Sequence, residues 1–164
     1  MFTPKYFNEI FVNKLPGYLG IVVTEMNKTE VRAKMEVTES NIAPNGFLYA
    51  ASVVTLADIS CGNGCLSNLP EGASGFTTIE LKSNHLGTAR EGTIECVANP
   101  VHVGRTTQVW DAVVSHKQSG KTIALFRCTQ MILYPVSYAQ PPVSSDAHVF
   151  AAERSGMHQD DGCD

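Results

Sequence analysis

The run Ala50-Ala-Ser-Val-Val-Thr-Leu-Ala-Asp-Ile-Ser-Cys-Gly-Asn-Gly-Cys-Leu66 decides the fold class of this chain. Its apolar residues occur on most sides of a helix, which predicts one long helix that is largely buried. The triplet Asn68-Leu69-Pro70 indicates where this helix ends. Gly62 and Gly64 either weaken its last turns or permit close approach by another backbone.

Asp58 is an unexpected residue in the middle of this apolar helix. A buried carboxylate is costly unless it is paired or its pKa shifts. One interpretation is structural: Asp58 shares a narrow polar stripe with Ser52 and Thr55, or faces a partner cation. The other is functional: Asp58 is a general base or a nucleophile in a site that the helix lines. The residues alone leave both interpretations open.

Strands are predicted on both sides of the helix. Apolar and polar residues alternate strictly over residues 31–37, and together with residues 20–26 this segment predicts a hairpin. Pro100 indicates a bulge or an edge position in a later strand. One long helix against a mainly antiparallel sheet is an α+β architecture. The four strands predicted after the helix cover residues 76–85, 93–103, 106–117 and 122–134.

The length of 164 residues fits a single domain, which we predict over residues 1–135. Its core spans residues 17–134, and an amphipathic N-terminal helix spans residues 4–15 until Pro16-Gly17 ends it. Residues 136–164 are dominated by Pro, Ser, Ala, Gly and Asp. That composition predicts a loosely ordered or disordered C-terminal tail.

Composition narrows the choice of partners. The formal net charge of −4 and the pI near 5.7 give no basic face for a nucleic acid. No apolar run reaches the ~18 residues of a membrane span, and the first residues do not resemble a secretory signal. The five cysteines are odd in number and contain no Cys-x-x-Cys motif. We therefore expect reduced thiols, a cytoplasmic location, no metal site and no membrane partner.

The segment Asn45-Gly-Phe-Leu-Tyr-Ala-Ala-Ser-Val-Val-Thr-Leu-Ala-Asp58 resembles the helix start of phenylacetate-pathway (PaaI-like) acyl-CoA thioesterases, which have the hotdog fold. In that family a His-Gly-Gly triplet opens the helix, and an acidic residue follows the first Gly by eight positions. Three later segments resemble the family in the same order: Thr78-Ile-Glu-Leu-Lys82, His102-Val-Gly-Arg-Thr-Thr107 and Lys121-Thr-Ile-Ala-Leu-Phe-Arg127. The resemblance implies a hotdog fold, in which a mainly antiparallel sheet wraps one long buried helix.

The resemblance also implies catalytic roles. Asp58 matches the family's carboxylate, which activates water or attacks the thioester carbonyl. Ala50 matches the first Gly, whose backbone N–H polarises that carbonyl. Thr78 matches a hydroxyl position that faces the site, apparently from the adjoining subunit. The family's water-holding amide falls on Ala43 here, so Asn45 is a candidate to replace it, although Asn45-Gly46 is also typical of a simple turn.

Binding roles follow in the same way. Arg105 and Thr106 match the turn that meets coenzyme A, with a solvated hairpin turn as the structural alternative. Arg90 is a candidate for a further phosphate contact. Tyr49 and Ala51 stand where the family has His and the second Gly, and they would line the thioester channel. No cofactor is implied, because coenzyme A is part of the substrate. The implied assembly is a homodimer or homotetramer with sites between subunits.

The residues Tyr49-Ala50-Ala51 leave two alternative functions open besides hydrolysis. One is an acyl-CoA binding module without catalysis, since Tyr49 and two methyl groups replace His-Gly-Gly. The other is a hotdog dehydratase or hydratase, which would pair a histidine with a carboxylate. Tyr49 at the histidine position counts against this second alternative. Hydrolysis of an acyl-CoA thioester, with an aryl or medium-length acyl group, is the function that the sequence favours.

Overall fold

The computed structural model describes residues 2–135, so the tail predicted for residues 136–164 lies outside the described residues. The longest helix is α3, Ala50–Ser67, which confirms the predicted helix. Its buried side chains, among them Val53 and Leu56, belong to the hydrophobic core between the helix and the sheet. The side chain of Asn68 caps its end by donating a hydrogen bond of 2.9 Å to the carbonyl of Gly64.

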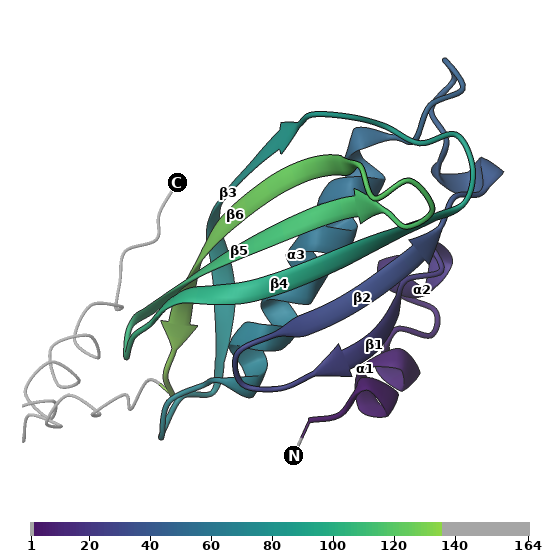
Figure 1. Ribbon diagram of the computed structural model, residues 1–164. Helices are drawn as coiled ribbons and strands as arrows, with labels where there is room; N and C mark the ends of the chain where they lie inside the picture. The colour runs from purple at the N-terminus through teal and green to yellow at the C-terminus, as the bar shows by residue number, and fades with distance from the viewer. Residues whose placement is uncertain (1, 136–164) are drawn as a thin grey trace, which may run out of the picture.

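Six strands form one antiparallel sheet that curves around α3 (Figure 1). Their spatial order is β1-β2-β4-β5-β6-β3, so β1 and β3 are the edge strands. Every pairing in the sheet is antiparallel, which confirms the α+β architecture with one long helix. The strands are β1 Val22–Met26, β2 Val31–Glu36, β3 Gly75–His85, β4 Thr93–Val103, β5 Thr107–His116 and β6 Thr122–Leu133.

Two glycines of α3 let aromatic rings approach the helix. A Cβ atom on Gly64 would lie 2.4 Å from the ring of Trp110, and one on Gly62 would lie 3.1 Å from Cζ of Phe76. Close packing of this kind leaves no space for even one methyl group at Gly64. The close approach at these glycines therefore involves side chains of the sheet, not another backbone.

Two bulges shape the strands beside the helix. The register of β4 against β5 shifts between Pro100 and His102. Because β4 lies inside the sheet, the predicted bulge is confirmed and the alternative of an edge position is wrong. The register of β3 against β6 shifts between Thr78 and Glu80. This second bulge keeps Thr78 and Leu81 on the same face, since both lie opposite buried residues of β6.

The N-terminal helix is shorter than the one predicted for residues 4–15. Helix α1, Pro4–Ile10, begins at the expected proline and ends early. The chain reverses near Asn13, which has a φ of 59°. Pro16-Gly17, predicted to end the first helix, instead lies within a second short helix, α2, Leu15–Tyr18. Apolar periodicity continues across Asn13, so the sequence pattern did not reveal the break.

Helix α1 covers the edge of β1. The side-chain amide of Asn8 donates to the carbonyl of Val23 at 2.9 Å and accepts from its N–H at 2.8 Å. These two hydrogen bonds satisfy backbone groups that an edge strand otherwise leaves open. In the described part of the chain, no element pairs with the outer edge of β3.

The segment between β2 and α3 brings the chain to the start of the long helix. It contains the short 3₁₀ helix η1, Glu39–Asn41, and an isolated bridge between Ile42 and Leu48. The N–H of Leu48 donates to the carbonyl of Ala89 at 2.9 Å, which holds the helix start beside the β3–β4 connection. Among residues 2–135, no helix has the length and apolarity needed to cross a membrane.

Candidate active site

Asp58 lies about two turns into α3, next to Thr78 of β3. Its Oδ1 atom is buried and has no hydrogen-bond partner in the described part of the chain. Burial raises the pKa of the Asp58 carboxyl, and the Thr78 hydroxyl opposes that rise. A half-buried carboxylate with so few donors is destabilised as an anion and is therefore more basic than an exposed one.

The structural interpretation of Asp58 finds no support in these contacts. No ion pair within residues 2–135 includes Asp58, so no partner cation faces it there. Thr55 donates its hydroxyl proton to the carbonyl of Ala51 at 2.8 Å, within its own helix. Ser52 is buried at 5% exposure, whereas Thr55 and Asp58 are half-buried.

Thr78 belongs to a chain of polar groups behind Asp58. Its Oγ1 donates to Oε1 of Gln130 at 2.9 Å, across the β3–β6 pair. Nε2 of Gln130 donates in turn to Sγ of Cys128 at 3.2 Å. Thr78 lies beside Asp58 of its own chain, on the edge strand β3.

The N-terminus of α3 presents free backbone donors. Tyr49 is the N-cap, and its carbonyl accepts from the N–H groups of Ser52 and Val53. Within residues 2–135, the N–H groups of Ala50 and Ala51 donate to no protein atom, and both residues are exposed. Together with the positive end of the helix dipole, they form a place where a carbonyl oxygen can be polarised.

The asparagines before the helix serve the local fold. Oδ1 of Asn45 accepts from the N–H of Phe47 at 3.2 Å, and the next residue, Gly46, has a φ of 80°. Asn41 is buried, and its side chain bonds to the backbone of Thr38 and Glu36. Asn45 therefore occupies a turn, as its structural alternative predicted, and within residues 2–135 its side chain has no hydrogen bond to Asp58.

Arg90 lies beside the start of α3. Its guanidinium covers the ring of Phe47 at 4.3 Å from the centroid. The hydrogen bond between Leu48 and Ala89 brings this arginine toward Tyr49, whose side chain is 53% exposed. Tyr49, Ala50, Ala51 and Arg90 thus gather at one end of the helix.

Arg105 and Thr106 lie at the opposite end, in the turn between β4 and β5. The hydroxyl of Tyr134 donates to the carbonyl of Arg105 at 2.6 Å, and the N–H of Ile132 donates to the carbonyl of Thr106 at 2.9 Å. Gln108, just after this turn, donates to the carbonyl of Asn68 at the end of α3. The 18 residues of α3, about 27 Å, therefore separate this turn from the helix start within one chain.

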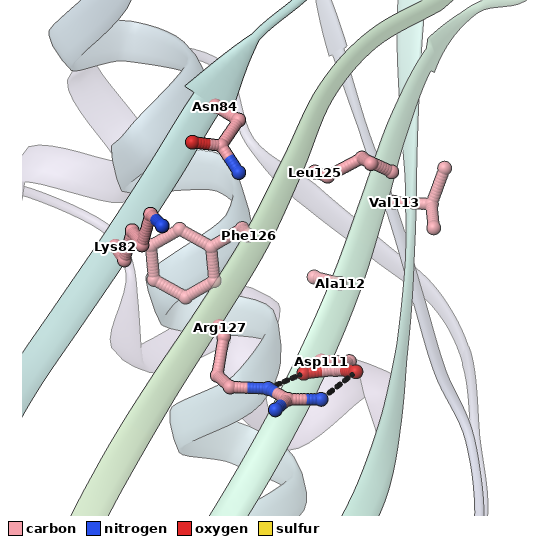
Figure 2. Close-up of a pocket in the computed structure, with 8 residues that line it drawn as sticks. All are labelled: Lys82, Asn84, Asp111, Ala112, Val113, Leu125, Phe126 and Arg127. Carbon is pink, nitrogen blue, oxygen red and sulfur yellow. Dashed lines mark hydrogen bonds and ion pairs between the residues drawn. The ribbon is translucent and has the colours of Figure 1, made fainter.

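A hollow of about 340 Å³ lies elsewhere, on the outer face of the sheet (Figure 2). Arg127 and Asp111 form a bidentate ion pair there, at 2.5 Å and 2.7 Å. The face is the one that points away from α3, because these residues alternate with buried Ala112 and Phe126. The hollow is therefore separate from Asp58 and from the helix start.

Sequence reasoning missed Gln130, which is 0% exposed. The signal was present: Gln130 follows Cys128 and precedes Ile132 on the apolar face of a strand. A polar residue at a core position is the same kind of anomaly that identified Asp58. Its contact with Thr78 was not predictable, because the two residues are 52 positions apart and their pairing depends on the β3 bulge.

Metal-ligating residues are scattered through the fold. No group of three or more His, Cys, Asp or Glu side chains in residues 2–135 lies close enough to hold a metal ion. The four described cysteines, Cys61, Cys65, Cys96 and Cys128, are free and buried. The remaining cysteine, Cys163, lies outside the described residues.

The chain is similar in sequence to known proteins. The family model of the "Thioesterase superfamily" matches residues 45–123, which include the helix start and Asp58. The "Putative esterase ComA2" of Bacillus subtilis is 30% identical over 115 residues, which are 70% of this chain and 90% of that protein. The "1,4-dihydroxy-2-naphthoyl-CoA hydrolase" of Listeria monocytogenes is 28% identical over 111 residues, which are 68% of this chain and 89% of that protein.

A solved structure supports the fold. The PaaI protein of Escherichia coli, from the phenylacetic acid degradation operon, superposes with a TM-score of 0.68 at 23% identity. The match covers 78% of this chain and 92% of that one. The helix wrapped by an antiparallel sheet is thus shared with the family that the sequence motifs resembled. The chain belongs to the thioesterase superfamily and has its hotdog fold.

Proposed function

We propose that this chain hydrolyses an acyl-CoA thioester to the free acid and coenzyme A, with Asp58 as general base or nucleophile. The observation that carries the proposal is the half-buried Asp58 carboxyl next to β3, whose buried Oδ1 atom accepts no hydrogen bond from any described group. Such a carboxylate can accept a proton from water or attack a carbonyl carbon. Membership of the thioesterase superfamily supports the same chemistry.

Hydrolysis of a thioester needs few catalytic groups. A thiolate leaves readily, so the protein has to deliver a nucleophile and stabilise the oxygen that becomes negative. Asp58 meets the first need by activating water or by attacking directly. The free N–H of Ala50 at the helix start meets the second, because it donates to the developing oxyanion at the positive end of the dipole.

Two chains are needed to bring these groups to one carbonyl. Within one chain, eight residues of helix separate Ala50 from Asp58, a rise of about 12 Å. Both groups have to lie about 3 Å from the reacting atoms. We therefore propose that each site combines Asp58 of one chain with Ala50 of a second copy.

The outer edge of β3 is the surface on which we propose that the copies meet. It is an unpaired strand of 11 residues, and Ile79 and Leu81 on it are 54% and 46% exposed. The other edge, β1, is covered by Asn8. Antiparallel pairing of two β3 strands places the last residues of one strand beside the first residues of the other. A homodimer is thus the minimal unit, and a homotetramer remains our proposal for the full assembly.

This dimer also explains the positions of the arginines. Arg90 lies at the start of α3, whereas Arg105 and Thr106 lie at its far end. Pairing through β3 brings the Arg105 turn of one chain toward the helix start of the other. We propose that Tyr49, Ala51 and Arg90 of one chain, with Arg105 and Thr106 of its partner, bind the pantetheine and phosphates of coenzyme A.

Two further parts of the proposal concern chemistry and location. No cofactor is needed for the hydrolysis, because coenzyme A enters as part of the substrate. The free buried thiols fit a reducing compartment, which supports a cytoplasmic location. An aryl or medium-length acyl group is the proposed cargo, and the naphthoyl-CoA substrate in the name of the Listeria relative supports an aryl group.

A panel of benzoyl-, phenylacetyl- and hexanoyl-CoA tests the proposed activity. We expect the protein to release free thiol from at least one of them, with kcat of ~1 to 10³ s⁻¹ as for ordinary enzymes. Absence of thiol release from every member of the panel, and from naphthoyl-CoA thioesters, would contradict hydrolysis.

Non-catalytic binding is the second candidate, and Tyr49-Ala50-Ala51 in place of His-Gly-Gly favours it. Calorimetric titration with a non-hydrolysable thioether analogue of benzoyl-CoA separates the two candidates. Tight binding without turnover of the corresponding thioester identifies a binding module. Binding together with turnover identifies the hydrolase. A dehydratase is disfavoured, because Tyr49 stands where such an enzyme needs its histidine.

A further inference from the structure

Gln130 is a buried amide that the proposed reaction does not yet use. It lies on β6 between Cys128 and Ile132, it is 0% exposed, and its cross-strand neighbours are Thr78 and Gln108. Burying an amide is costly unless both of its ends are hydrogen-bonded. The partners of Gln130 therefore indicate what keeps it in place.

The neighbouring Gln108 shows what a purely structural glutamine does in this fold. Its Nε2 donates to the carbonyl of Asn68 at the end of α3, at 2.9 Å. Its Oε1 accepts from the indole N–H of Trp110, also at 2.9 Å. Both ends of Gln108 thus bind groups that hold the helix and the core, and neither end reaches the site.

Unlike the partners of Gln108, one partner of Gln130 lies next to the proposed catalytic group. Its Oε1 accepts the hydroxyl proton of Thr78 at 2.9 Å, and its Nε2 donates to the thiol sulfur of Cys128, which is a weak acceptor. Thr78 in turn lies beside the Asp58 carboxyl, whose Oδ1 atom has no partner in the described part of the chain. A hydroxyl has only one proton to donate. Asp58 and Gln130 therefore compete for it.

We propose that Gln130 is a positioning residue: by accepting the only hydroxyl proton of Thr78, it withholds a hydrogen bond from the Asp58 carboxylate and keeps that group reactive. This inference rests on the proposed role of Asp58. A hydrogen bond to the charged form of a carboxyl lowers its pKa and its basicity. Removing the acceptor at Gln130 directs the Thr78 proton to Asp58, whereas removing the Thr78 hydroxyl removes the proton for which the two groups compete.

The other titratable groups near Asp58 are buried. They are thiols: Cys61 on its own helix, with Cys128 on β6 and Cys96 on β4 beyond it. A hydrogen bond with Cys128 and burial raise the pKa of Cys61 well above the ordinary thiol value. Burial raises the pKa of Cys96 to about 12. A change in the acidic limb of the rate profile therefore reports Asp58.

The test compares the pH dependence of kcat/KM for three variants of the full chain. In Gln130→Met the acidic limb moves to lower pH by about one unit, because Asp58 gains the Thr78 proton. In Thr78→Val the limb does not move to lower pH, because no hydroxyl proton remains that could be donated to Asp58. The double variant Thr78→Val/Gln130→Met matches Thr78→Val, because Gln130 acts only through that hydroxyl. Gln108→Met is the matched control, and its limb stays at the wild-type position. Gln130→Leu replaces Gln130→Met should the latter not fold.

The inference is overturned if Gln130→Met leaves the acidic limb of the kcat/KM profile unmoved. It is also overturned if Gln130→Met shifts this limb equally in the Thr78→Val background, or if Gln108→Met shifts the limb as much as Gln130→Met does. A second readout does not need activity: a ¹³C NMR titration of the Asp58 carboxyl, assigned by the signal missing from Asp58→Asn, shows the same shifts in pKa. Full activity in Asp58→Asn contradicts the proposed function, and the NMR titration still decides whether Gln130 controls Asp58.

Discussion

At the scale of single residues, the proposed chemistry depends on one carboxyl group with few partners. Asp58 lies against β3 with Oδ1 buried and unpaired, while its neighbour Thr78 donates to Gln130. The fold thus tolerates a group that destabilises it when ionised. Functional sites often carry such a cost, because a fully satisfied carboxylate is a poor base.

This cost predicts how stability depends on pH. The folded-state pKa of Asp58 is raised above its unfolded value, because burial disfavours the anion. Its contribution to stability is therefore full below the unfolded pKa and is lost as the pH rises through the folded pKa. The variant Asp58→Asn has no carboxyl to ionise. We therefore expect this variant to be more stable than the wild type at pH 8, and the difference in stability to be smaller at pH 4.

Thermal unfolding of both proteins between pH 4 and pH 8 checks this expectation. Each kcal/mol corresponds to ~2–4 °C in Tm for a chain of this size. Asp111→Asn is the control, since Asp111 is partly exposed and paired with Arg127. A difference in Tm between Asp58→Asn and wild type that is constant with pH, or that shrinks as the pH rises, contradicts the buried, unpaired state of Asp58.

At the scale of elements, the start of α3 has a backbone role that can be isolated. Pro is tolerated at the first residue of a helix, because the N–H there has no partner within the helix. Tyr49 precedes that position with φ −71° and ψ 132°, which suits a residue before proline. Ala50→Pro should therefore keep the fold and remove the proposed oxyanion donor.

We expect Ala50→Pro to lower kcat by ~10² to 10³-fold, as the loss of one oxyanion donor does elsewhere. Steady-state thiol release measures this loss, and circular dichroism verifies the helix. Ala50→Gly keeps the N–H and is the matched control, with activity near the wild-type level. Equal activity in Ala50→Pro and Ala50→Gly would show that this N–H does not act.

The elements also show what the sequence can predict. The bounds of α3 and of the strands after it follow from local periodicity, since burial on one face imposes period two on each strand. The break after Ile10 was missed, because it depends on the backbone of Asn13. Asp58 was visible as a polar residue in an apolar helix. Its contact with Thr78 was not, because it depends on how β3 lies against α3, which no local pattern encodes.

At the scale of the whole molecule, the two ends of α3 divide the site. Ala50 and Arg90 lie at one end, while Arg105 and Thr106 lie at the other, about 27 Å away. One chain therefore holds two incomplete halves. In the two-fold dimer that we propose, pairing through the open edge of β3 completes both halves at once.

Mixed dimers test this division directly. Ala50→Pro and Asp58→Asn each inactivate every site in their own homodimers. A mixed dimer regains one intact site, with Asp58 from one chain and Ala50 from the other. Unfolding and refolding the two variants together should restore about a quarter of the wild-type activity, since half of the dimers are mixed and each has one of two sites intact. Refolding each variant alone is the control, and no recovery in the mixture contradicts a site shared between chains.

The edge of β3 gives a second check of the assembly. Leu81→Arg places a charge on the exposed edge strand, and we expect monomers in sedimentation velocity together with loss of thiol release. Val113→Arg, on the outer face of the sheet, is the control for the dimer. A monomer with full activity would show that one chain is sufficient.

The central claim, that Asp58 carries out the hydrolysis, is tested most directly by thiol release from benzoyl-CoA under single-turnover conditions. Wild type, Asp58→Asn and the control Asp111→Asn are compared at equal concentrations of folded protein. We expect Asp58→Asn to be slower by ~10² to 10⁴-fold and Asp111→Asn to keep the wild-type rate. An Asp58→Asn protein that retains most of the wild-type rate would contradict the account.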